Sequence, residues 1–120
     1  MLPFLNNTNG KNADTVITPQ EARRIMTETK EYILLDVRMP DEYRQVRIDG
    51  AKLIPVNELP ERAPFELTDK QAQILVYCHS GARAEKAVNL LRQMGYENVS
   101  SFGGIMNWPY DKINGKEGII

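Results

Sequence analysis

The sequence predicts an α/β fold in which a parallel sheet of about five strands is covered by helices on both faces. The first observation is that short runs rich in Val, Ile, Leu and Tyr alternate along the chain with segments whose apolar residues recur at helical spacing. The second is that residues 32–37 are apolar at nearly every position, as in a strand buried on both faces. Strands that alternate with helices favour parallel pairing, which places an active site at the carboxyl ends of the strands.

The chain opens with residues 1–14, a segment rich in Asn, Thr and Gly that we interpret as a flexible lead-in without a core of its own. Residues 15–120 are expected to form a single domain, because a chain of this length can bury a core. A short strand is predicted at 16–17. Thr18 then serves as a helix N-cap, followed by a proline and by Glu21 three residues after the cap, which is typical of a helix start.

The middle of the chain begins with the strand at 32–37, and a short helix is predicted at 40–43. Residues 51–56 indicate another strand, at an edge of the sheet because Pro55 has no N–H to donate. The segment 57–67 contains two further prolines and is predicted to be irregular, with room for one helical turn.

The last part of the chain contains the strongest periodic signals. A β-branched and aromatic run at 73–77 predicts a buried strand, and the Ala- and Leu-rich stretch at 83–94 predicts an amphipathic helix. Gly95 is the expected helix stop, and residues 98–102 form the last predicted strand.

Composition excludes several classes of function. The formal net charge of -1, with acids and bases interspersed, argues against a nucleic-acid or polybasic membrane surface. One cysteine and one histidine cannot make an internal disulfide or a zinc site, so neither a metal nor a cofactor is expected. No apolar stretch reaches the roughly 20 residues of a membrane helix. We expect a cytoplasmic protein, with the periplasm left open, that is a monomer or a weak dimer.

The single cysteine, Cys78, lies where the strand at 73–77 ends and the helix at 83–94 begins. The tight loop and the first turn of the helix would direct backbone N–H groups at the sulfur, and the helix dipole would add positive charge there. Such surroundings favour a nucleophilic thiolate. The alternative role for a lone cysteine is that of a small buried hydrophobe.

The substrate-binding loop predicted after Cys78 has varied side chains. Ser80 is either a donor to the sulfur or a turn residue, and Gly81 allows the backbone to curl. Arg83 is assigned as a fixed cation at the rim of the predicted active-site pocket. His79 is assigned as a titratable charge at the mouth of that pocket rather than as a general base. The five predicted loop residues are His79, Ser80, Gly81, Ala82 and Arg83.

Four segments occur in a characteristic order: Leu35 to Arg38 with Glu42–Tyr43, then Ile48 to Pro55, Cys78 to Ala84, and Phe102 to Trp108. Together they resemble the single-domain rhodaneses, the thiosulfate sulfurtransferase family, over nearly all of 16–108. The resemblance implies a rhodanese-like three-layer fold and places Asp36 and Arg38 near the active-site loop. His79 departs from the family, in which arginine most often follows the cysteine.

Two other features have physical interpretations of their own. Asp36, Arg38 and Glu42 are spaced so that they can meet in a structural ion-pair network. Gly103–Gly104 permits a sharp exit from the last strand near the cysteine loop. Trp108 is expected to fill the edge of the core, and the alternative is that Met106 or Trp108 forms an apolar lip for the substrate.

The predicted reaction moves a sulfane sulfur from thiosulfate, or from another persulfide donor, through a Cys78 persulfide to cyanide or a thiol, including a protein cysteine. The alternatives are a dedicated protein persulfide carrier and a non-catalytic interaction module. Phosphatases and arsenate reductases share the fold, but their loop is one residue longer. Because Arg83 stands five positions after Cys78, the shorter loop argues against them.

Overall fold

The computed structural model describes residues 14–114. Residues 1–13 of the predicted lead-in and 115–120 of the tail lie outside the described residues. The elements, in chain order, are α1 (Pro19–Glu28), β2 (Ile33–Asp36), α2 (Pro40–Gln45), β3 (Val46–Arg47), β4 (Lys52–Leu53), η2 (Val56–Glu58), α3 (Leu59–Glu66), β5 (Gln73–Cys78), α4 (Ala82–Gln93), β6 (Asn98–Gly104), η3 (Ile105–Asn107) and β7 (Ile113–Asn114).

The main sheet has four strands in the order β4-β2-β5-β6, and all its pairs are parallel. The predicted α/β class and the edge position of β4 are confirmed. The strand predicted at 16–17 is reduced to one bridge, between Val16 and Ser101 beside β6, so the expected fifth strand is only marginal.

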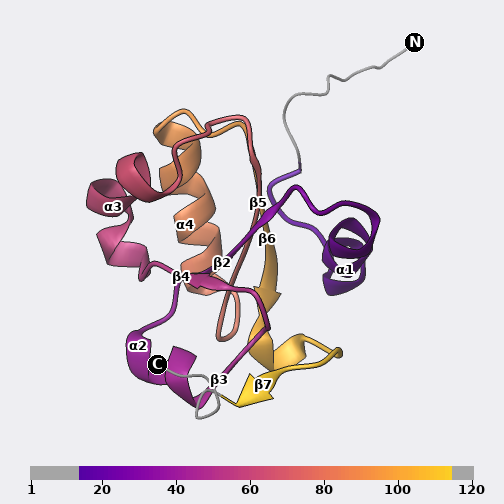
Figure 1. Cartoon of the computed structure of the whole chain (residues 1–120). Coiled ribbons are helices and arrows are strands. Elements are labelled where there is room, and N and C mark those ends of the chain that lie inside the picture. The colour runs from indigo at the N-terminus through magenta and orange to yellow at the C-terminus, as the bar shows by residue number, and fades with distance from the viewer. Residues whose placement is uncertain (1–13, 115–120) are drawn as a thin grey trace.

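Helices cover both faces of this sheet, with α1 on one side and α3 and α4 on the other (Figure 1). Thr18 caps α1 as predicted, because its Oγ1 accepts the Glu21 N–H at 3.0 Å. Two buried clusters fill the space between the layers, and both contain side chains of the central strands β2 and β5. The expected three-layer architecture is therefore present.

The predicted irregular segment at 57–67 is wrong, because α3 is a helix of eight residues. Its first proline, Pro60, lies in the first turn, where the missing N–H costs nothing. Buried Leu59, Ala63 and Leu67 recur every four residues and face α4 and the sheet. This apolar stripe offsets the cost of Pro64 inside the helix.

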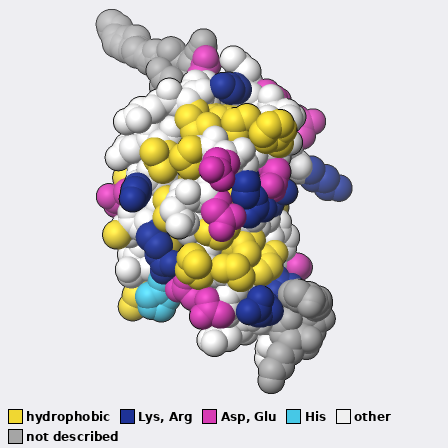
Figure 2. Space-filling view, turned by 90° about the vertical axis from the view of Figure 1, so that its left-hand side faces the viewer, with side chains coloured by type: hydrophobic (Ala, Val, Ile, Leu, Met, Phe, Trp, Pro, Cys, Tyr) yellow, Lys and Arg dark blue, Asp and Glu magenta, His cyan; other side chains and the backbone are white. Residues whose placement is uncertain are grey.

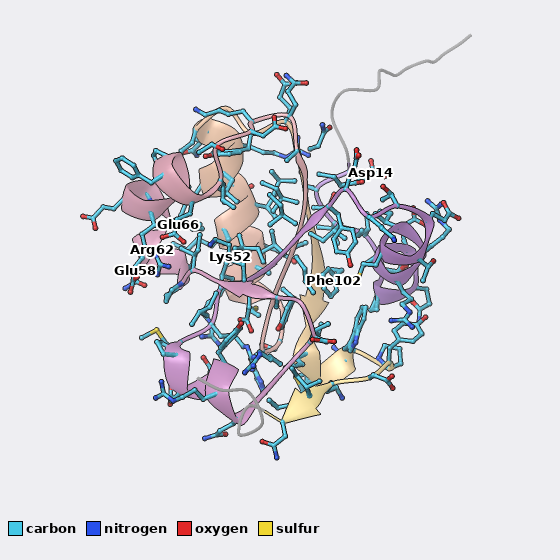
Figure 3. The ribbon with its side chains drawn as sticks, in the orientation of Figure 1. Asp14, Lys52, Glu58, Arg62, Glu66 and Phe102 are labelled. Carbon is cyan, nitrogen blue, oxygen red and sulfur yellow. The ribbon has the colours of Figure 1, made fainter. Side chains whose placement is uncertain are left out.

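A charge network of half-buried and exposed side chains lies between α3 and β4. Arg62 donates to Glu58 at 2.9 Å and to Glu66 at 2.7 Å, and Lys52 pairs with Glu66 at 3.0 Å. The face of the molecule that carries α3 shows acidic and basic side chains side by side between hydrophobic areas (Figure 2). The four labelled side chains of the network lie together between β4 and α3 (Figure 3).

A second, antiparallel sheet of two short strands joins β3 to β7, with Arg47 opposite Ile113. The sequence did not predict this sheet. It brings the described end of the tail against the segment that follows α2, at the end of the molecule where α2 also lies (Figure 1). The active-site end of the main sheet therefore has an additional wall.

Candidate active site

Cys78 is the last residue of β5 and lies at the carboxyl end of a central strand, where the sequence placed it. Its side chain is 1% exposed. The sulfur accepts hydrogen bonds from two backbone amides, Gly81 N–H at 3.0 Å and Ala84 N–H at 3.3 Å. Because the second amide belongs to the first turn of α4, the sulfur sits at a helix N-terminus, where the backbone stabilises negative charge.

The connection from β5 to α4 is only three residues long, His79 to Gly81. Gly81 has a φ of 122°, in the region that favours glycine, and this conformation turns its N–H towards the sulfur. His79, Ser80 and Ala82 are exposed, whereas Arg83 is half-buried. Within residues 14–114 the Ser80 hydroxyl makes no hydrogen bond to the sulfur, so its placement fits a turn residue.

The end of β6 supports this loop from behind. The Met106 N–H donates to the His79 carbonyl at 3.2 Å. A Cβ on Gly104 would lie 1.9 Å from that carbonyl oxygen and 2.5 Å from the Cα of Ser80. Only glycine fits at such a distance, which confirms that the paired glycines allow β6 to pass close to the cysteine loop.

Arg83 is held at the rim by Glu42 of α2. Its two terminal nitrogens donate to the two carboxylate oxygens at 2.8 and 3.0 Å, and the Met39 N–H donates to the same carboxylate at 2.9 Å. The hydrogen bonds from Arg83, more than those from the backbone, lower the pKa of Glu42 to about 2. The sequence predicted a fixed cation here, and the structure adds that Glu42 both fixes and neutralises it.

Asp36 and Arg38 form a second ion pair, with side chains 0% and 2% exposed. The guanidinium donates to Asp36 at 2.7 to 3.1 Å and to the Val46 carbonyl at 2.7 Å. Burial by itself would lower the pKa of the Arg38 guanidinium. The hydrogen bonds to Asp36 and the charge of its carboxylate outweigh burial, so the pKa is raised. The structure therefore replaces the predicted network by two separate pairs: Asp36 with Arg38, and Glu42 with Arg83.

A pocket of about 530 Å³ opens beside the loop. Met106, 60% exposed, lines it, whereas Trp108 is buried against Phe102 and Tyr110. Trp108 thus fills the core as predicted, and Met106 lies on the wall of the pocket. The pocket is lined by Arg38, Glu42, Gln45, Val46, His79, Ile105, Met106 and Lys112.

Sequence reasoning missed two parts of this site. The pairing of Glu42 with Arg83 joins residues 41 apart, and the wall formed by β7 with Lys112 joins the tail to β3. Among the described residues, no three His, Cys, Asp or Glu side chains lie together in a way that could hold a metal ion. In the same part of the chain no helix has the length and apolar character needed to cross a membrane.

Comparison with known proteins identifies relatives of this arrangement. The family model of the rhodanese-like domain matches residues 18–110. The chain is 36% identical over 81 residues to thiosulfate sulfurtransferase PspE of Escherichia coli, covering 68% of this chain and 78% of that protein. It is 34% identical over 84 residues to a sulfurtransferase of Allochromatium vinosum, covering 69% and 77%.

Solved structures give the same result. A rhodanese with anions from E. coli superposes with a TM-score of 0.66 at 34% identity, covering 70% of this chain and 99% of that one. The rhodanese-like domain of an Anabaena sp. protein superposes with a TM-score of 0.76 at 29% identity, covering 84% and 80%. The fold is therefore that of a known architecture.

Proposed function

Because the chain belongs to the rhodanese-like family and is a sulfurtransferase, we propose that it moves the outer sulfur of thiosulfate to a nucleophilic acceptor through a persulfide on Cys78. The observation that carries this proposal is the placement of the Cys78 sulfur, 3.0 and 3.3 Å from two converging backbone amides. Amides aimed at one atom stabilise a thiolate there without a separate general base. His79 follows the cysteine but faces the neighbouring pocket.

In the first step the Cys78 thiolate attacks the outer sulfur of thiosulfate. A new sulfur–sulfur bond forms, the original one breaks, and sulfite leaves with the bonding electron pair. The negative charge that was on the thiolate now lies on the terminal sulfur of the persulfide. The loop amides and the N-terminus of α4 supply positive electrostatic potential for that charge.

In the second step the acceptor attacks the terminal sulfur of the persulfide. With cyanide the product is thiocyanate, and with a thiolate it is a new persulfide; in both cases the Cys78 thiolate is released with the electron pair. Both half-reactions are displacements at sulfur, so neither needs a redox cofactor or a metal.

The dimensions of the loop support sulfur as the transferred group. Only three residues separate β5 from α4, and the sulfur already accepts hydrogen bonds from the backbone N–H groups of Gly81 and Ala84. A ring of amides around a tetrahedral oxyanion needs a longer loop, so we expect no turnover of aryl phosphates or arsenate.

The test is steady-state sulfur transfer from thiosulfate to cyanide by the purified chain and its Cys78→Ser variant, with thiocyanate as the readout. We expect turnover in the parent chain and none in the variant, because serine forms no persulfide. The control is Ser80→Ala, which removes an exposed hydroxyl of the same loop and is expected to retain transfer. Absence of thiocyanate from the reduced parent chain would contradict the proposal and favour a carrier dedicated to one protein partner.

A further inference from the structure

The pocket beside the cysteine loop is larger than either of the small ions in the reaction requires. At about 530 Å³ it has the volume of a site for an organic molecule rather than for cyanide or thiosulfate alone. His79, the residue next to Cys78, lies on its wall. A molecule in this pocket therefore lies against the residue that follows the reacting cysteine.

The wall of the pocket is divided by chemistry. Val46, Ile105 and Met106 give it an apolar side, and the Met106 side chain is 60% exposed. Such a surface binds a short carbon chain by removing it from water. Thioether side chains adapt to ligands of different shape, so this side favours an aliphatic segment without requiring one length.

Most of the charged groups on the wall already have partners. Arg38 is paired with Asp36, and Glu42 is paired with Arg83 at 2.8 and 3.0 Å. Lys112 is exposed and makes no ion pair or hydrogen bond with any residue in the range 14–114. Its ammonium group is thus the lining cation that remains available to an incoming anion.

The position of Lys112 is set by the backbone. It directly precedes β7, whose Ile113 pairs with Arg47 of β3 in the second sheet. Val46, on the same short strand β3, contributes to the apolar side of the pocket. One small sheet therefore supplies both the cation and part of the apolar wall.

We propose that this pocket is an acceptor site for small thiols that carry a carboxylate, with Lys112 as the group that binds the carboxylate. The inference rests on the proposed function and identifies its acceptor class. The carbon chain contacts Met106 and Val46, and the thiolate attacks the terminal sulfur of the Cys78 persulfide. The acceptor leaves as a persulfide and the electron pair returns to the Cys78 sulfur.

The test compares two thiols of similar length, 3-mercaptopropionate and 2-mercaptoethanol, as acceptors with thiosulfate as donor. For Lys112→Glu we expect kcat/KM for mercaptopropionate to fall roughly three- to tenfold, the range of an exposed charge pair turned into repulsion. For mercaptoethanol, which has no charged end, we expect less than about a twofold change. Sulfite release is the readout for both.

The matched control is Lys86→Glu, which makes the same change in net charge at an exposed position of α4 that does not line the pocket. It is expected to leave both thiols unaffected. Equal changes for the two thiols, or the same loss in Lys86→Glu, would overturn the acceptor site. Transfer to cyanide is measured in parallel: if it persists while the two thiols are not distinguished, the acceptor site fails and the sulfurtransferase mechanism stands.

Discussion

Two groups of ion pairs in this protein resemble each other in composition and differ in surroundings. The pair of Asp36 and Arg38 lies at the active-site end of the sheet, with side chains 0% and 2% exposed. The network around Arg62 lies between α3 and β4 (Figure 3), and its side chains are 28% to 45% exposed. The pair of Arg83 and Glu42, with side chains 34% and 30% exposed, is about as accessible to water as that network but lies at the rim of the active site.

The difference shows what each group contributes. Water screens the α3 network, so its pairs add little to the free energy of unfolding. The Asp36–Arg38 pair is shielded from water, so removing one partner leaves the charge of the other buried and uncompensated. The pair also fixes the chain after β2, from which α2 brings Glu42 to Arg83. Burial, rather than the number of ion pairs, therefore determines which charges hold the active-site end together.

The largest expected effect comes from breaking the buried pair on one side. Arg38→Met leaves the Asp36 carboxylate buried without its partner and should reduce the free energy of unfolding by about 3–5 kcal/mol. Urea unfolding followed by circular dichroism measures this loss. The double variant with Asp36→Asn removes the unpaired charge and should regain a large part of it; no recovery would contradict the electrostatic explanation.

The second effect concerns Gly104, which carries no charge and supports the active-site end by close packing against the cysteine loop. Gly104→Ala places a methyl group against the His79 carbonyl at 1.9 Å, although the backbone φ of -130° suits any residue. We expect a loss of about 1–3 kcal/mol in stability from overpacking and at least a tenfold loss of sulfur transfer as the loop shifts. Gly50→Ala, which meets no atom within 4 Å, is the control: its backbone φ of 88° makes the variant cost stability as well, but it should retain sulfur transfer because the new methyl group touches no residue of the loop.

A smaller effect is expected when the pair of Arg83 and Glu42 at the rim of the active site is broken. Glu42→Gln should lower the free energy of unfolding by about 1 kcal/mol at pH 7 and reduce sulfur transfer, because Arg83 loses its bidentate partner. The pKa of Glu42 falls from 4.5 to about 2 in the folded chain. Its contribution is therefore complete above about pH 4.5 and is lost as the pH falls towards 2.

Urea unfolding of the parent chain and of Glu42→Gln at a series of pH values tests this dependence. The difference between the two curves should shrink as the pH falls from about 4.5 to 2. A difference that stays constant over this range would show that the carboxylate charge is not its origin.

The smallest effect is expected on α3. Arg62→Ala removes two ion pairs that remain accessible to water and should cost about 1 kcal/mol or less, with sulfur transfer unchanged. The cost should decrease further in high salt, since exposed charges are screened. A loss as large as that of Arg38→Met would invalidate the contrast between buried and exposed pairs.

The sequence was sufficient for the parts of the molecule that depend on local patterns. Apolar periodicity predicts β2, β5 and α4, and the break between strand and helix identifies the place of Cys78. Helix α3 was missed because its prolines were interpreted as breakers, although buried Leu59 and Ala63 stabilise it through tertiary packing. The sheet of β3 and β7 has two residues in each strand, too few for any periodic signal.

For the site, too, the parts that depend on local sequence were predictable, and the parts that depend on contacts between distant segments were not. The loop from Cys78 to Arg83 is continuous in sequence, so its geometry follows from one strand, one turn and one helix. The partner of Arg83 and the position of Lys112 depend on contacts between distant segments. The short spacing of Asp36, Arg38 and Glu42 suggested one network. In the structure Asp36 pairs with Arg38, whereas Glu42 of α2 pairs with Arg83 of α4.

The most direct test of the central claim is the intact mass of the chain after incubation with thiosulfate in the absence of an acceptor. The account predicts a gain of one sulfur atom in the parent chain, located on the peptide that contains Cys78 and removed by cyanide with release of thiocyanate. The Cys78→Ser variant should show no gain. An unmodified parent chain, or a gain of sulfur that persists in the variant, would contradict Cys78 as the residue that carries the transferred sulfur.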